Sequence, residues 1–210
     1  MANGFNQIVI TNSDTPDHTD LFRYVSSEGI LTAIRIAADL GEDAVFSDYH
    51  IISGVAYCYF ARSFLSTGGY TDSDPTSPIT NTLDGLWISE VTSDSQTSNA
   101  AQSLNLFITG ARKQVSYQST SRKFKGRPSP MTIFGQQTGL AFSYDVIVPR
   151  ANLSQLDTLQ SLFDANDTLC VRDPLGNRLF GRLNQIPFLD QINGDFFPLT
   201  FQQEDQTEAV

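Results

Sequence analysis

The sequence predicts a mainly β protein with one short α-helix, built as a β-sandwich or split-barrel domain that follows a smaller β-sandwich. Residues 139–149, GLAFSYDVIVP, show the period of a strand, because one parity is occupied by Leu140, Phe142, Tyr144, Val146 and Val148. Residues 152–164, NLSQLDTLQSLFD, repeat apolar residues at helical spacing, and Asn152 can cap this helix. The core candidates are Trp87, Phe107, Phe134, Phe142, Tyr144, Leu156, Leu159, Phe163, Phe180 and Phe197.

The first 70 residues are expected to form the smaller sandwich. Three apolar stretches, residues 5–11, 30–37 and 54–65, read as strands separated by turn-forming residues, although a short helix also fits 30–37. The long aromatic run in 54–65 suits a central strand with both faces covered, or a strand with one face on a partner. Residues 71–82 are rich in Ser, Thr and Pro and are predicted to be a linker or long loop.

Residues 83–210 are expected to form the second domain, in which the stretch 169–183 carries three arginines. These could belong to an active-site loop, but the sequence favours a β-hairpin. Pro174 suits the first central position of a turn, Gly176 and Asn177 follow it, and both flanks alternate like paired strands. The solvent or partner face of this hairpin is then predicted to carry Arg172, Arg178 and Arg182.

The charge and hydrophobicity of the chain make several classes of function unlikely. The net charge is −10 at pH 7, which disfavours broad nucleic-acid binding because an acidic chain repels phosphate. No 18-residue apolar run is present, so no transmembrane helix and no membrane partner are expected, and the first residues lack the features of a signal peptide. Cys58 and Cys170 lie in apolar stretches and are predicted to be buried thiols, with a disulfide left open.

Catalytic and metal-binding motifs are not evident in the sequence. His18 and His50 each have an aspartate nearby but lack the further ligands that a metal site needs, so they are interpreted as surface-loop residues. Asp72 and Asp74 resemble the start of a calcium loop, whose glycine and closing glutamate are missing. The sequence therefore predicts a protein that is not an enzyme and has no catalytic, metal or cofactor site.

Charge is unevenly distributed along the chain. Eight acidic residues and two arginines lie in the first 48 residues, whereas the window 112–127 contains six basic residues and no acidic one. The basic residues of this window are Arg112, Lys113, Arg122, Lys123, Lys125 and Arg127. A solvated loop would explain the window, and DNA contact is a weaker option. We favour head-to-tail assembly, in which the basic segment of one subunit meets an acidic surface of the next.

Three segments, in this order, resemble the minor tail proteins of long-tailed, siphovirus-type bacteriophages. They are SPITNTLDGLWISEV (77–91), KGRPSPMTIFGQQTGLAFSYDVIVP (125–149), and residues 152–203 with the helix, the hairpin LCVRDPLGNRLFGRLNQI and the strand GDFFPLTFQQ. The N-terminal stretch, with VITNSDTPDHTD and YHIISGVAYCYFARSF, is similar to the fibronectin-like module that often precedes such domains.

The resemblance implies a structural virion protein of the tail tip or baseplate, similar to the distal tail protein. Such a protein would be found in the virion, and in the host cytoplasm during assembly. Its partners would be copies of itself in a hexameric ring and other tail proteins, namely the tail tube, hub and tape measure. The alternative is a tail-tip module that binds a receptor or host cell-surface glycan through Tyr57, Tyr59 and Tyr70. A tail glycan hydrolase would need a carboxylate pair, and the sequence distinguishes none.

Overall fold

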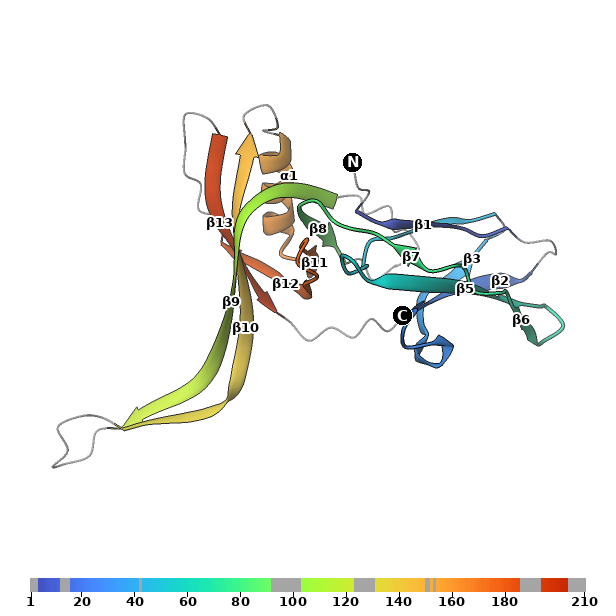
Figure 1. Ribbon diagram of the computed structural model, residues 1–210, viewed down its shortest axis with the longest axis horizontal. Helices are drawn as coiled ribbons and strands as arrows, with labels where there is room; N and C mark the ends of the chain where they lie inside the picture. The colour runs from blue at the N-terminus through green and yellow to red at the C-terminus, as the bar shows by residue number, and fades with distance from the viewer. Residues whose placement is uncertain are drawn as a thin grey trace.

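The computed structural model describes residues 4–11, 16–41, 43–91, 103–122, 131–149, 152, 154–185 and 194–203 (Figure 1). It is mainly β with one α-helix, as predicted. The strands are β1 (Asn6–Val9), β2 (His18–Val25), β3 (Ile34–Leu40), β4 (Val45–Asp48), β5 (Ala56–Phe64), β6 (Tyr70–Asp72), β7 (Ile79–Thr80), β8 (Leu86–Glu90), β9 (Ser103–Arg122), β10 (Met131–Pro149), β11 (Leu169–Arg172), β12 (Arg178–Gln185) and β13 (Gly194–Gln203), with a 3₁₀ turn η1 (Ile30–Thr32) and the helix α1 (Ser154–Ala165).

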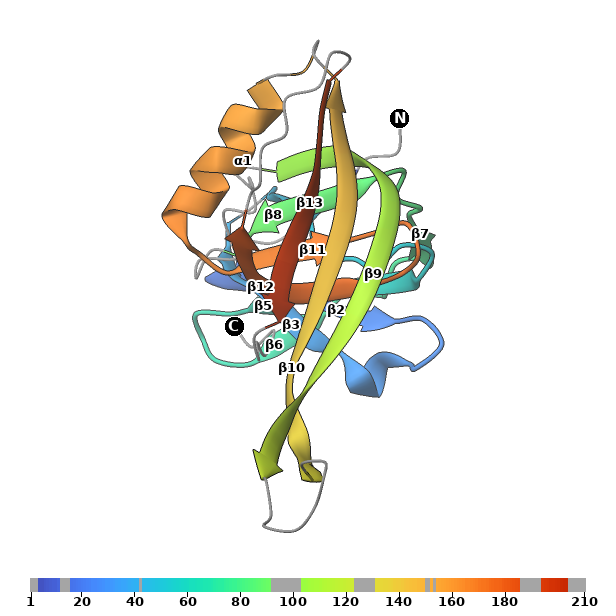
Figure 2. The same ribbon diagram turned by 90° about the vertical axis from the view of Figure 1, so that its left-hand side faces the viewer.

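The C-terminal part is a closed antiparallel barrel with the strand order β10-β13-β12-β11-β8-β9. The sequence did not decide between a sandwich and a split barrel. A closed barrel depends on pairing between strands far apart in the chain, which local sequence patterns do not encode. The helix α1 lies along one side of the barrel (Figure 2). It begins two residues after the predicted start, and its buried residues Leu159 and Leu162 belong to the barrel core.

Most predicted core residues are placed correctly. Phe142, Tyr144 and Leu159 lie in the barrel core, and Leu156 and Phe163 are partly buried against it. Phe180 is buried and Trp87 is partly buried, but both lie outside this core. Phe107 was predicted wrongly, because its side chain is 62% exposed. Leu104 and Leu106 are buried, so the even-numbered residues at this end of β9 face the barrel core and the odd-numbered Phe107 faces outward. The side chains of Phe134 and Phe197 lie outside the described residues.

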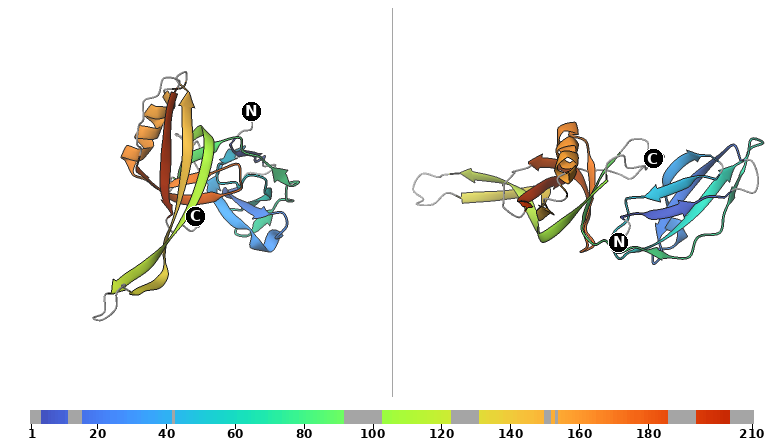
Figure 3. Two further views of the ribbon diagram at one scale, coloured as in Figure 1. Left: turned by 60° about the vertical axis from the view of Figure 1, so that its left-hand side comes forward. Right: turned by 90° about the horizontal axis from the view of Figure 1, so that it is seen from above.

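The N-terminal part consists of two antiparallel sheets that face each other across a second core. One sheet pairs β1 with β4, and the other has the order β3-β2-β5-β6, with β7 also paired to β5. The core between them receives Ile8 from β1, Phe46 from β4, and Leu21, Ala37 and Tyr59 from the larger sheet. We call this two-sheet unit the N-terminal sandwich; it lies beside the barrel (Figure 3).

Two N-terminal predictions need correction. Residues 71–82 are not a separating linker along their whole length, because β6 and β7 both pair with β5 and the Thr76 N–H donates to the Tyr59 carbonyl at 2.8 Å. The stretch 30–37 begins with η1 and becomes a strand only at Ile34. By contrast, Tyr57 to Phe60 of β5 are all buried, as expected for a central strand.

Candidate functional site

A long two-stranded ribbon projects from the barrel (Figure 1). β9 and β10 pair from Phe107↔Ile147 to Met131↔Arg122, with register shifts along the way. Only Ser103–Leu106 of β9 pair with β8, and only the segment 141–149 of β10 pairs with β13. Within the described residues, no other strand lies beside the part of this ribbon that begins at the Val115↔Leu140 pair, which we call the arm (115–122 and 131–140). The sequence predicted short strands and a loop here, and missed the arm.

The described part of the basic segment begins at the base of this arm, where Arg112 and Lys113 pair with Ser143 and Phe142 of the barrel. Arg112 and Lys113 are exposed. The Arg112 Nη2 is 3.2 Å from the Asp145 carboxylate, and the Lys113 Nζ lies 5.6 Å from the centre of the Phe142 ring. Arg122 ends β9, but its side chain is outside the described residues, as are Lys123, Lys125 and Arg127 entirely. The structure thus places the first two predicted residues at the exposed base of the arm and does not describe the other four side chains.

The predicted hairpin is confirmed. β11 and β12 pair in register from Leu169↔Gly181 to Arg172↔Arg178. The turn is a three-residue loop in which Pro174 occupies the first central position and Gly176 has a φ of 86°, a conformation that favours glycine. Asp173 holds this loop, because its carboxylate accepts the N–H groups of Leu175 and Asn177 at 3.0 and 2.9 Å. The Asn177 side-chain amide also donates to Asp173, at 2.7 Å.

The arginine face of the hairpin differs from the prediction. Arg182 is exposed, as expected, but Arg172 is fully buried and Arg178 is half-buried. The reason is that this face packs against the N-terminal sandwich of the same chain. Arg178 Nη1 donates to the carbonyl of His50 at 2.6 Å, and Arg172 Nη1 donates to the carbonyl of Gly4 at 2.6 Å. The partner of this face therefore comes from the chain itself.

We call this contact between the sandwich and the outer faces of β8, β11 and β12 the junction. The His50 ring meets Phe180 edge-on, with centroids 5.5 Å apart. Gly4 lies so close to Trp87 that an added Cβ would fall 2.3 Å from the indole ring. The Leu83 N–H donates to the Ser53 hydroxyl at 3.0 Å. His50, interpreted from the sequence as a surface residue, is thus a junction residue.

A buried polar network supports the loop that carries His50. The Arg23 Nη1 lies 2.9 and 2.8 Å from the two carboxylate oxygens of Asp48, and both side chains are 3% exposed. Tyr59 donates to Asp48 at 2.9 Å and accepts from the Asn6 amide at 2.9 Å. Burial alone would raise the pKa of Asp48, but the Arg23 charge and the His50 N–H outweigh it and hold that pKa below its ordinary value.

One cluster of described residues has metal-ligand chemistry. His18, Asp20 and Asp39 each offer one ligand atom, and these atoms lie within 4.8 Å of one another. A bulge in β3 brings Asp39 beside His18 and Asp20. Thr19 pairs with Leu40 and Leu21 pairs with Ala37, so β3 has one more residue than β2 between these two pairs. The sequence gave no sign of this third ligand, because a bulge between distant strands leaves no local motif. Arg35 already donates to Asp20 at 3.2 Å and would compete with a cation.

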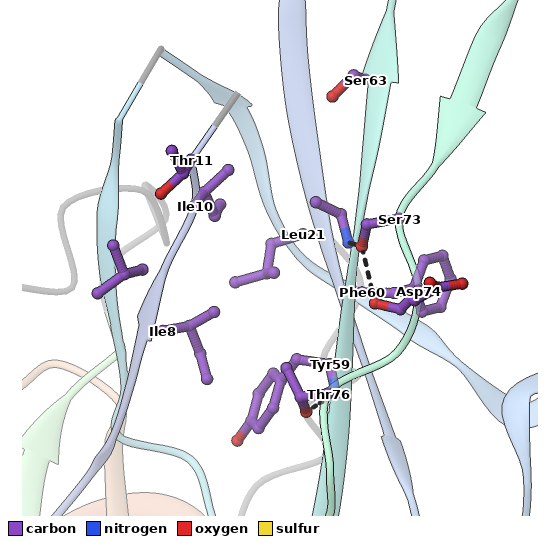
Figure 4. A pocket seen from close by; sticks show the side chains of 12 residues that line it. Ile8, Ile10, Thr11, Leu21, Tyr59, Phe60, Ser63, Ser73, Asp74 and Thr76 are labelled. Atoms are coloured by element: carbon purple, nitrogen blue, oxygen red, sulfur yellow. Dashed lines mark hydrogen bonds between the residues drawn. The ribbon is translucent and has the colours of Figure 1, made fainter. Parts of the chain in front are cut away.

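Two pockets are formed by the sandwich. One, of about 240 Å³, opens between β1 and the segment that follows β6, with Ile8, Ile10 and Tyr59 around it (Figure 4). The other, of about 310 Å³, is lined by residues of the larger sheet together with Arg178 of the barrel. Neither contains an exposed tyrosine platform, because Tyr57 and Tyr59 are 3% and 0% exposed.

The two cysteines are buried, Cys58 in β5 and Cys170 in β11, and no disulfide joins them. This confirms the buried-thiol prediction. Among the described residues, no helix is long and apolar enough to cross a membrane. The sequence matches no known family model. No curated protein matches it either.

Proposed function

We propose that this chain is a structural subunit of a long-tailed phage tail tip or baseplate, which assembles with copies of itself into a ring between the tail tube and the hub or receptor-binding apparatus. The observation that carries the proposal is the arm. An isolated two-stranded ribbon is marginally stable in water. An arm of this length is therefore expected to gain its full stability by packing on another subunit.

Charge complementarity supports self-assembly through the arm. Between residues 95 and 144 the chain has six basic residues and no acidic one, and of these six Arg112 pairs with Asp145. Residues 1–84, by contrast, have eleven acidic residues and three arginines. All three of these arginines pair with aspartates of the sandwich itself, leaving exposed acids such as Glu28, Asp43 and Asp74. The arm of one copy therefore fits the sandwich surface of the next, and repeating that contact closes a ring if the rotation closes.

The same proposal includes an assignment for the N-terminal sandwich. We infer that the N-terminal sandwich corresponds to the fibronectin-like module of such tail proteins, which its two facing antiparallel sheets support. The alternative, a glycan- or receptor-binding module, is not favoured. It needs an exposed aromatic surface, and of its three tyrosines only Tyr70, 57% exposed, is accessible. Its ring already lies 4.1 Å from the Arg62 guanidinium.

Light scattering across a range of salt tests the proposal. The full chain, 23.2 kDa as a monomer, is expected to form a closed multimer at low salt and to dissociate as salt rises, because screening weakens contacts between charges. A variant in which an Asn-Gly turn replaces residues 116–139, joining Val115 to its register partner Leu140, is expected to stay monomeric.

Two controls sharpen this test. Charge reversal at Lys123, Lys125 and Arg127 is expected to weaken assembly with an unchanged circular dichroism spectrum, whereas reversal of Arg62, a cation outside the arm, leaves assembly intact. A full chain that is monomeric at every salt concentration contradicts self-assembly. A shortened chain that still assembles like the full chain shows that another surface makes the ring.

A further inference from the structure

Two neighbouring side chains at the junction carry buried donors without acceptors. Arg172 is 0% exposed and makes one hydrogen bond, from Nη1 to the Gly4 carbonyl. Its Nε and Nη2, and the Nε1 of Trp87, are buried and have no acceptor among the described residues. Polar groups in protein interiors are almost always paired, so three orphan N–H-bearing nitrogens point to an acceptor that the described part of the chain does not supply.

These donors lie together. Arg172 of β11 is the register partner of Trp87 of β8, so the two side chains leave the barrel on the same face, one directly opposite the other. Ser89, opposite Cys170 on the same face, has a buried hydroxyl that is also without a partner. One patch of the junction thus concentrates hydrogen-bond donors.

The charge balance of the junction is positive. Arg178 is the register partner of Arg172 on the other side of β11. Asp48, the acid whose charge acts on Arg172, is already bound to Arg23. Burial, the largest influence, lowers the pKa of Arg172, as expected for a guanidinium removed from water. A buried cation without an anionic partner is strongly unfavourable.

We propose that the junction binds a small inorganic anion of the halide class, held by Arg172 Nε and Nη2 and by Trp87 Nε1. Such an anion accepts all three N–H groups and neutralises the arginine. A water molecule supplies no charge and would have to accept three donors with two lone pairs. The proposal is independent of ring assembly.

Bromide is the probe. In crystals grown with sodium bromide, we expect an anomalous peak within hydrogen-bonding distance of Arg172 Nε or Nη2 and of Trp87 Nε1. In solution, we expect a higher melting temperature in chloride or bromide than in gluconate at equal ionic strength, because only the small anions fit and ligands that bind the folded state stabilise it.

Three variants make the test specific. Trp87→Phe removes one donor and keeps an aromatic ring, so we expect about tenfold weaker bromide binding. Arg172→Met is expected to abolish the anion dependence of the melting temperature. Arg62→Met, which removes a partly exposed arginine far from Arg172 in the sequence, is expected to retain this dependence. Equal melting temperatures in chloride and gluconate, or a junction without a bromide peak, would overturn the proposal and assign the donors to water.

Discussion

Among the described residues, the barrel core is apolar except for the Tyr144 hydroxyl and the buried Asp173 carboxylate that accepts it, whereas the N-terminal sandwich buries an ion pair. In the barrel, the Tyr144 hydroxyl donates to Asp173 at 3.2 Å. In the sandwich, Arg23 and Asp48 bind each other with both side chains 3% exposed. Burial is the main reason why the pKa of Tyr144 and the pKa of Tyr59 are both raised. Both hydroxyls therefore keep their protons and act as hydrogen-bond donors.

This difference shows how the two cores acquire their specificity. An apolar core tolerates rearrangement as long as volume is kept. A buried ion pair must be satisfied in one arrangement, because breaking it leaves a bare charge in the interior. The sandwich network positions His50, whose carbonyl accepts Arg178 of the barrel. The polar core is thus linked to the surface on which the sandwich meets the barrel.

The largest effect is expected from Asp48→Asn, which breaks the sandwich network. It leaves Arg23 buried without a countercharge, and we expect a loss of about 3–5 kcal/mol in the free energy of unfolding. Urea denaturation followed by circular dichroism measures this loss. The matched control is Asp72→Asn, which breaks the partly exposed pair with Arg62 and is expected to cost less than about 1 kcal/mol. Equal losses for the two variants would contradict the comparison.

The counterpart in the barrel is Leu159→Ala. Leu159 of α1 is fully buried in the barrel core, and we expect a loss of roughly 3 kcal/mol from the lost apolar contact and the remaining cavity. The loss is expected to be the same in low and high salt, since no charge is involved. A loss below about 1 kcal/mol would mean that α1 is not a firmly packed part of the barrel.

The sequence predicted the elements whose signal is local. The alternation ending at Pro149, the leucine spacing of α1, and the Pro174 and Gly176 turn each depend on residues close together in the chain, and the structure confirms all three. Arg172 could not be placed in the same way. Alternation assigns it to the outer face of the hairpin, but only the fold shows that the sandwich covers that face.

Long-range pairing limited the remaining predictions. Barrel closure requires β10 to pair with β13, and the register Val146↔Phe197 has no local sign in the sequence. Phe107 was assigned to the core because aromatic residues favour burial, yet the parity of β9 turns it outward. The metal-ligand cluster was missed for the same reason, since Asp39 reaches His18 through a bulge between two strands.

A smaller effect is expected from Gly176→Val, which acts on the hairpin that joins the two cores. The φ of 86° strains a β-branched residue, so we expect a loss of about 1–3 kcal/mol, read as a lower melting temperature. Gly176→Asn is the matched control, because asparagine adopts this conformation more readily. An unchanged melting temperature for the valine variant would contradict the turn geometry.

The smallest effect is expected in mild acid, where the two cores respond differently. Because the pKa of Asp48 is lower in the folded chain than its ordinary value of 3.8, its stabilising contribution is complete above about pH 4 and is lost as the pH falls through the folded value. The difference in unfolding free energy between the wild type and Asp48→Asn is therefore expected to be constant from about pH 7 to 5 and to shrink below about pH 4. The difference for Leu159→Ala has no such dependence, since no titrating group is removed. A difference for Asp48→Asn that stays constant down to pH 3 would mean that Arg23 does not depress the pKa of Asp48, and the contrast between the two cores would then rest on packing alone.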